Sequence, residues 1–188
     1  MGKALSEMTL EELWKLFPIF LVEPSNKWAS SYNKIEAILK ETLSEYPVER
    51  ISHIGSTAIH GIWAKDIVDV LIEISVNSDM EMTAKMIEEN GFIRMTSSMS
   101  RVSFNRGYTE DGFAEEVYHV HLRYAGDNDE LYFRDYLNEY TQVAKDYELM
   151  KLKLWKRYEH NRDAYTDAKT EFIRKWTSEA RNAYYGRY

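Results

Sequence analysis

A glycine followed by two hydroxyl residues, Gly55-Ser56-Thr57, comes directly after a predicted strand that ends at Ile54. Glycine lets the chain turn sharply, and the backbone amides and Ser56 hydroxyl that follow can approach a phosphate closely. Twelve residues separate Ser56 from Asp69, so a phosphate-binding turn and a carboxylate could face each other from neighbouring strands. Nucleotidyl transfer needs both parts, which makes Asp69 and Ser56 candidate catalytic residues.

Two histidines two residues apart, His119 and His121, suggest a metal site. Residues i and i+2 of a strand share one face, so both imidazoles could bind one ion with Asp69 as a third ligand. Glu73 lies on the same strand face as Asp69 and is a further candidate ligand. We expect a divalent metal, Mg²⁺ or Mn²⁺, with Zn²⁺ an option through the histidines. The alternative is that the imidazoles hydrogen-bond buried backbone or Asp69 without any metal.

Several cations are available to neutralise a phosphate. The candidate ligand-binding residues are the turn Gly55, Ser56 and Thr57 together with Lys65, Arg106, Arg123 and Lys169. For each cation taken alone, an ordinary salt bridge is the competing interpretation. Asp69 lies within the apolar run Ile67 to Ile74, where an unmatched carboxylate is costly, so some cation must reach it.

The elements that must position these residues alternate between helices and strands. Apolar residues at helical spacing predict helices over residues 9–17, 25–46, 79–90, 129–140, 141–158 and 163–184, the first opened by a capping box of Thr9 and Glu12. Segments rich in β-branched and aromatic residues predict strands over 48–54, 67–74, 92–94, 99–106 and 117–124. The fold class is therefore α/β (α+β), with a sheet core over about 48–124 and helices over about 129–184 packed on it, in a single domain spanning 1–188.

The composition limits the sites, the location and the ligands that can be expected of this protein. The 188 residues include no cysteine, which excludes disulfides, thiolate zinc sites and a cysteine nucleophile. The sequence shows neither a signal peptide nor an apolar run long enough to span a bilayer, so we expect a cytoplasmic protein without membrane association. The net charge is -7, although residues 151–188 hold ten Lys and Arg against five Asp and Glu. An acidic body argues against duplex nucleic acid, whereas the basic end could attract one phosphorylated small molecule.

The chain resembles the GrpB family between about residues 45 and 180. The matching segments are His53-Ile-Gly-Ser-Thr57, Gly61-Ile-Trp-Ala-Lys65, Ile67-Val-Asp69, Phe104-Asn-Arg106-Gly, His119-Val-His121-Leu-Arg123, Phe133-Arg-Asp-Tyr-Leu137 and Tyr165 through Lys169 to Phe172-Ile173. The resemblance implies a nucleotidyltransferase-like fold, a short mixed β-sheet backed by helices with a helical C-terminal part. That superfamily places a second carboxylate two residues after the first, but here the position is Leu71.

Three functions are compatible with these residues. The first is metal-assisted nucleotidyl transfer from a nucleoside triphosphate, with Asp69 on the metal and Ser56 on phosphate. The second is a non-catalytic module that binds a nucleotide or another small anion, because the second acid is missing. The third is metal-dependent hydrolysis of a phosphate ester through Asp69, His119 and His121. The sequence does not fix the oligomeric state.

Overall fold

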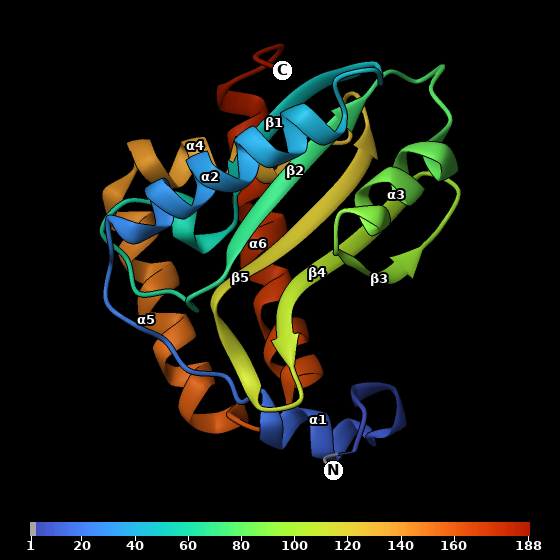
Figure 1. Ribbon diagram of the computed structural model, residues 1–188. Coiled ribbons are helices and arrows are strands. Elements are labelled where there is room, and N and C mark those ends of the chain that lie inside the picture. Colours follow the sequence, from blue (N-terminus) through green and yellow to red (C-terminus); the bar gives the residue numbers. More distant parts are fainter. Residues whose placement is uncertain (1–2) are drawn as a thin grey trace.

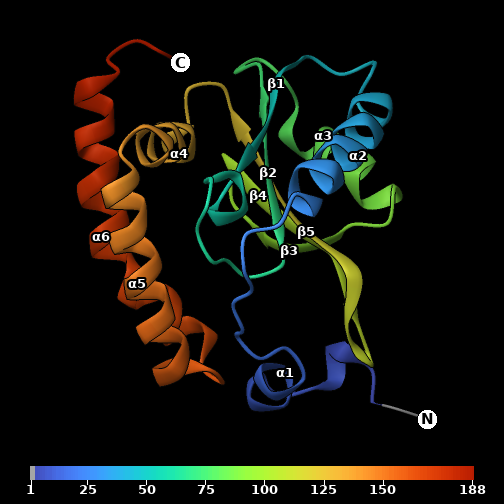
Figure 2. The ribbon, with the colours of Figure 1, turned by 90° about the vertical axis from the view of Figure 1, so that its left-hand side faces the viewer.

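The protein consists of a central β-sheet covered by helices on both faces (Figures 1 and 2). The computed structural model describes residues 3–188. Within this part the strands are β1 (Val48–Ile54), β2 (Val68–Ile74), β3 (Ile93–Ser97), β4 (Arg101–Thr109) and β5 (Gly112–Tyr124). The helices are α1 (Leu10–Leu16), α2 (Lys27–Thr42), α3 (Met80–Glu89), α4 (Asp129–Glu139), α5 (Thr141–Tyr158) and α6 (Arg162–Ala183). Two short 3-10 turns, Leu5–Glu7 and Ser56–Ala58, complete the set.

The five strands form one mixed sheet in the order β1-β2-β5-β4-β3. Strands β2 and β5 are parallel, whereas the other neighbouring pairs are antiparallel. The register pairs Asp69 with His119, Leu71 with His121 and Glu73 with Arg123 across β2 and β5. Alternate residues of a strand point to opposite faces, so all six of these side chains belong to one face of the sheet, the face covered by α4, α5 and α6.

The opposite face of the sheet holds the main apolar core. Val70 and Ile72 of β2 and Val120 of β5 pack there with Ile35 and Leu39 of α2. Helix α3 closes the same side (Figure 1). A second core lies between the loop that follows β1 and helices α4 to α6, with Ile59, Ile62, Phe133, Leu137 and Tyr147 as members. The two cores fix the sheet between two helical layers, and the polar face of β2 and β5 meets the second layer.

The expected mixed sheet and helices are confirmed, with small differences at their ends. The capping box of Thr9 and Glu12 forms as the spacing predicts. Strands β4 and β5 are longer than predicted, because residues 107–109 and 112–116 continue the hairpin instead of belonging to a loop, with Tyr108 opposite Phe113. Gly107 permits this continuation, since a Cβ there would lie 2.3 Å from the Glu116 carbonyl oxygen. The extension matters because it brings Tyr108 beside His119.

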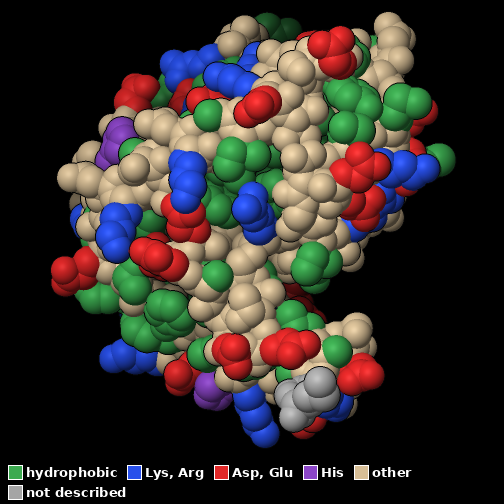
Figure 3. Space-filling view, in the orientation of Figure 1, with side chains coloured by type: hydrophobic (Ala, Val, Ile, Leu, Met, Phe, Trp, Pro, Cys, Tyr) green, Lys and Arg blue, Asp and Glu red, His purple; other side chains and the backbone are tan. Residues whose placement is uncertain are grey.

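The surface over α2 and α3 carries acidic and basic side chains interspersed with apolar ones (Figure 3). Within residues 3–188, no helix combines the length and the apolar character needed to cross a membrane.

Candidate functional site

A cavity of about 800 Å³ lies between the polar face of the sheet and the helices α4, α5 and α6. Its inner end is lined by the turn Gly55, Ser56 and Thr57, by Lys65, Asp69 and His119, and by Tyr147 and Lys151 of α5. Helix α6 contributes Arg162, Tyr165, Lys169, Ile173, Arg174 and Thr177 along one side. The structure therefore brings together the turn, Asp69, His119, Lys65 and Lys169, as the sequence predicts.

Gly55 is required for the close contact between the turn and Asp69. Its φ is +72°, a conformation that favours glycine, and a Cβ at this position would lie 2.4 Å from Asp69 Oδ2. The turn that follows is held by Thr57, whose hydroxyl donates to the Ile67 carbonyl oxygen at 3.2 Å and lies 2.9 Å from His53 Nε2. The Thr57 hydroxyl is thus engaged in the fold, whereas Ser56 lines the cavity.

Replacing Gly55 by alanine is expected to lower the free energy of unfolding by about 3 kcal/mol, from backbone strain plus the clash with Asp69. Gly61→Ala is the matched control, because Gly61 has φ +71° and a Cβ added there would meet no atom within 4 Å. It should cost only the strain, about 1 to 2 kcal/mol. Denaturant unfolding of both variants measures the difference. Equal losses would contradict the close packing of Asp69 on the turn.

Asp69 is held by two imidazoles. His119 Nδ1 lies 3.2 Å and His121 Nε2 3.5 Å from Asp69 Oδ1. On the other side of its ring, His119 Nε2 lies 2.8 Å from the Tyr108 hydroxyl, which accepts a hydrogen bond from Arg162 at 2.7 Å. A guanidinium can only donate, so the Tyr108 proton points to His119 Nε2, and the ring proton of His119 is left on Nδ1, facing Asp69.

These contacts fix the charges at the inner end of the cavity. Burial by itself would raise the pKa of Asp69, but the hydrogen bonds from His119 and His121 outweigh it and hold that pKa well below its usual range. Burial lowers the pKa of His119, which keeps its ring neutral, and Arg162 acts in the same direction. Asp69 is therefore an ionised carboxylate that accepts N–H donors.

Two ammonium groups project into the cavity near Asp69. Lys65 and Lys169 both lie over the Tyr165 ring, with Nζ 5.9 Å and 4.5 Å from its centroid. Within residues 3–188, no carboxylate lies within ion-pair distance of either. Burial, reinforced by Arg162 and Lys169, lowers the pKa of Lys65 to about 7. Burial likewise lowers the pKa of Lys169 to about 8. In the described part of the chain, neither amine forms an ion pair, although the charge of Asp69 acts on both from a longer distance.

A third lysine, Lys151, anchors the loop that carries Lys65. It is 1% exposed, and its Nζ donates to the Trp63 carbonyl oxygen. Burial, together with the charge on Lys169, lowers its pKa to about 7. Glu148 of α5 accepts a hydrogen bond from the backbone amide of Trp63, a residue of the same loop, at 2.7 Å. The loop between β1 and β2 is thus fixed from α5, which places Lys65 at the cavity.

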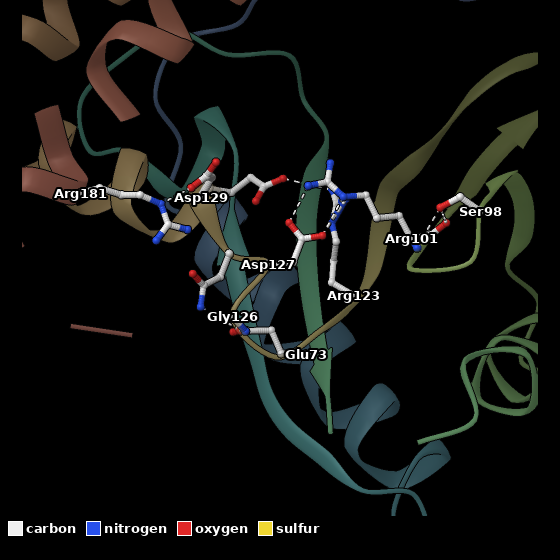
Figure 4. A network of polar contacts seen from close by, with 10 residues as sticks. Glu73, Ser98, Arg101, Arg123, Gly126, Asp127, Asp129 and Arg181 are labelled. Atoms are coloured by element: carbon white, nitrogen blue, oxygen red, sulfur yellow. Dashed lines mark hydrogen bonds and ion pairs between the residues drawn. The ribbon is translucent and has the colours of Figure 1, made fainter. Parts of the chain in front are cut away.

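Glu73 is not part of this site, and its prediction as a metal ligand is wrong. It shares a face with Asp69, but four residues along a strand separate the two by about 13 Å. Its Oε1 accepts from the Gly126 amide at 3.0 Å and from Asn128 at 2.9 Å (Figure 4), and its Oε2 pairs with Arg50 at 3.3 Å. With its side chain 3% exposed, Glu73 supports the turn between β5 and α4.

Arg106 and Arg123 also lie outside the cavity, contrary to their prediction as ligand-binding residues. Arg123 is on the correct face but beside Glu73, where it pairs with Glu130 at 3.1 Å (Figure 4). Arg106 pairs in register with Tyr118, so it points to the opposite face, with its guanidinium 5.6 Å from the Phe92 ring centroid.

The residues present do not fit the metal site that the sequence predicts. A ligating imidazole needs a free lone pair, but one His119 nitrogen carries the proton aimed at Asp69 and the other is engaged by Tyr108. Leu71, where a second acid is expected, is buried against Ile54 and Leu131. Across the described residues, no three His, Asp or Glu side chains are grouped so that they could hold a metal ion.

Sequence reasoning missed four residues of the site, Tyr108, Tyr147, Lys151 and Arg162. Arg162 could have been found, because it lies seven residues before Lys169 and therefore on the same face of α6. Tyr147 lies at helical spacing among the apolar residues of 141–158, a pattern typical of a packing residue; it is indeed buried, but it also lines the cavity. Its hydrogen bond with Ser56 only partly offsets the burial that raises its pKa to about 12.

Comparisons with known proteins place the chain in a family. The family model described as GrpB protein matches residues 18–179. The chain belongs to the GrpB family. The Glutamate-rich protein GrpB of Alkalihalophilus pseudofirmus is 32% identical over 165 residues, which cover 82% of this chain and 91% of that protein. The UPF0157 protein YqkA of Bacillus subtilis is 28% identical over 88% of this chain, which spans only 49% of that protein.

Solved structures agree with the GrpB assignment. The crystal structure of GrpB from Enterococcus faecalis, 25% identical, superposes with a TM-score of 0.76 over 88% of this chain and 99% of that one. A structure of the Cid1 poly(U) polymerase, 14% identical, has a TM-score of 0.54 over 85% of this chain and 52% of that one. At that identity the likeness concerns the fold alone, and it shows that this GrpB protein has a nucleotidyltransferase-like fold.

Proposed function

We propose that this GrpB protein binds a nucleotide or another phosphate-bearing small molecule in the cavity between the sheet and α6. The observation that carries this proposal is the pair of ammonium groups, Lys65 and Lys169, that project into the cavity without an acidic partner among the described residues. Buried charges are costly unless they are matched. An anionic ligand would supply the missing counter-charge.

The surroundings of the two lysines suit phosphate. The Ser56 hydroxyl and the backbone after Gly55 line the same end of the cavity, and Arg162 adds a guanidinium. Charge-assisted hydrogen bonds of this kind are among the strongest a protein makes to phosphate. The volume of about 800 Å³ falls in the upper part of the range of small-ligand sites, which leaves room for a nucleoside beside the phosphates.

Binding is a better fit than transfer or hydrolysis. The Cid1 poly(U) polymerase, whose fold is similar, was solved with MgATP bound. Metal-assisted transfer and hydrolysis both use ionised side chains that hold the ion in place. Here, among residues 3–188, Asp69 is the one carboxylate beside the lysines, and its two imidazole neighbours donate to it. We therefore propose a binding module rather than a metal-dependent transferase or hydrolase.

Calorimetric titration with AMP, ATP and inorganic phosphate tests the proposal. We expect saturable binding of at least one of these probes with one ligand per chain. Incubation of the same samples with labelled ATP and Mg²⁺ or Mn²⁺ should release no pyrophosphate. The absence of binding by all three probes would contradict the proposed function, and pyrophosphate release that is lost in Asp69→Asn would favour transfer instead.

Ligand affinity should depend on pH through the two lysines. In the ligand-free protein the pKa is about 7 for Lys65 and about 8 for Lys169, so both lose their charge as the pH rises from 6.5 to 9. Asp69 stays ionised over this interval, because the hydrogen bonds from His119 and His121 hold its pKa well below its usual range. We expect AMP affinity to fall about tenfold or more across it, since one or two charged hydrogen bonds weaken. Calorimetry at pH 8 should also show proton uptake on binding. An affinity that does not change with pH would contradict this assignment.

A further inference from the structure

The residue at position 71 distinguishes this cavity from a cavity that binds a metal-bound polyphosphate. Leu71 has no exposed surface and packs against Ile54 of β1 and Leu131 of α4. The next carboxylate on that face, Glu73, lies about 13 Å from Asp69 and is occupied by Gly126, Asn128 and Arg50. The inner end of the cavity, as the described residues form it, thus offers one carboxylate, Asp69, where the nucleotidyltransferase pattern has a second acid two residues later.

One oxygen of the Asp69 carboxylate already accepts from two protein groups. Its Oδ1 receives His119 Nδ1 and His121 Nε2, and its Oδ2 lies against the Gly55 backbone. Arg162 donates to the Tyr108 hydroxyl, and that hydroxyl donates to His119 Nε2. The N–H of the His119 ring is therefore on Nδ1, facing the carboxylate. A cation that approached Asp69 Oδ1 would have to displace these two donors.

Positive charge lies beside Asp69 instead of further carboxylates. Lys65 and Lys169 extend over Tyr165 toward the turn, and Arg162 stands next to His119. Three cations thus flank one carboxylate at the end of the cavity where phosphates would bind. Divalent ions neutralise phosphate oxygens in metal-assisted sites, and here fixed ammonium and guanidinium groups are in a position to do the same.

From this arrangement we infer that the cavity binds the polyphosphate group of a nucleotide as the metal-free anion, with Lys65, Lys169 and Arg162 in the place of the divalent ion. The inference rests on the proposed function and goes further, because it specifies the ionic form of the ligand. Mg²⁺ then competes with the protein for the triphosphate instead of bridging the two.

Calorimetric titration of ATP at pH 6.5, once with EDTA and once with excess Mg²⁺, tests the inference. We expect ATP to bind about tenfold more tightly with EDTA, because Mg²⁺ removes charge that the cations would otherwise meet. Equal or tighter binding with Mg²⁺ overturns the inference. Titration of AMP under both conditions separates the two proposals: if AMP binds but ATP needs Mg²⁺, only the inference about the metal-free anion fails, whereas if neither nucleotide binds, both proposals fail.

The variant Asp69→Asn gives an independent readout. Asparagine keeps an oxygen for the imidazole donors but removes the negative charge, so ATP with EDTA should bind about fivefold more tightly. In a metal-dependent site, Asp69→Asn would instead weaken ATP binding measured with excess Mg²⁺, and that result overturns the inference. The matched control is Lys175→Met, which removes a charge from α6 at an exposed residue outside the cavity and should leave the affinity unchanged. The melting temperature of each variant verifies that it is folded.

Discussion

Replacing Lys65 and Lys169 together by methionine is expected to weaken ATP binding by at least about 100-fold. Each ammonium would donate a charge-assisted hydrogen bond to phosphate, and such a bond contributes about 1.5 to 3 kcal/mol. Losing two of them amounts to about 3 kcal/mol or more, and 1.4 kcal/mol corresponds to a factor of ten. Calorimetry at pH 6.5, where both lysines of the unsubstituted protein are charged, measures the effect.

The matched control is the double variant Lys153→Met and Lys175→Met. It removes the same charge from α5 and α6 at exposed residues that do not line the cavity. Its ATP affinity should stay within about twofold of the unsubstituted protein, since screened surface charges contribute little. A loss of affinity equal to that of the Lys65 and Lys169 variant would show that only net charge matters and would contradict a local phosphate site.

The same two lysines should make the ligand-free protein more stable at alkaline pH. Their pKa values of about 7 and 8 in the folded chain lie below the value near 10.4 of a free lysine. Between these limits the unfolded chain binds more protons, so the free energy of unfolding rises with pH. The difference in unfolding free energy between the unsubstituted protein and the double methionine variant should shrink as the pH rises from 7 to 10. A difference that stays constant would contradict the burial of unpaired ammonium groups.

The second large effect concerns stability rather than binding. Glu73→Ala is expected to lower the free energy of unfolding by about 3 kcal/mol, because it leaves Asn128 and the partly buried Arg50 without their shared partner. Since Glu73 lies outside the cavity, the ATP affinity of the folded variant should not change. Denaturant unfolding and calorimetry provide the two readouts.

Glu73→Gln distinguishes the loss of charge from the loss of packing. The amide oxygen can still accept from Gly126 and Asn128, so only the interaction with Arg50 is lost, and the expected loss is about 1 kcal/mol. If Glu73→Ala abolished ATP binding while the protein stayed folded, the assignment of Glu73 to the β5 to α4 turn would be wrong.

The sequence predicted most of the sheet because strand patterns are local. The predicted segment 48–54 coincides with β1, and alternation along β5 correctly put His119 and His121 on one face. The same alternation explains two errors. It identifies a face but not a position along it, which is why Glu73 was grouped with Asp69 although the two lie about 13 Å apart. Alternation within β4 also does not tell which of its two faces meets the cavity, and the register with β5 puts Arg106 opposite Tyr118, on the other face.

The part of the site that the sequence could not predict comes from contacts between layers. Nothing in residues 141–188 indicates that Lys151 and Arg162 will meet the turn after β1, because that contact depends on how α5 and α6 pack against the sheet. The extended hairpin is a similar case. Tyr108 reaches His119 only because β4 continues past Gly107, whereas the sequence pattern predicts a strand that ends at residue 106.

The most direct test of the account is a crystal structure of the protein soaked with ATP in the presence of EDTA. The account predicts phosphate oxygens within hydrogen-bond distance of both Lys65 Nζ and Lys169 Nζ, next to Ser56, with no metal ion between the phosphates and Asp69. Phosphates bound away from the two lysines, or a metal ion bridging them to Asp69, would contradict it.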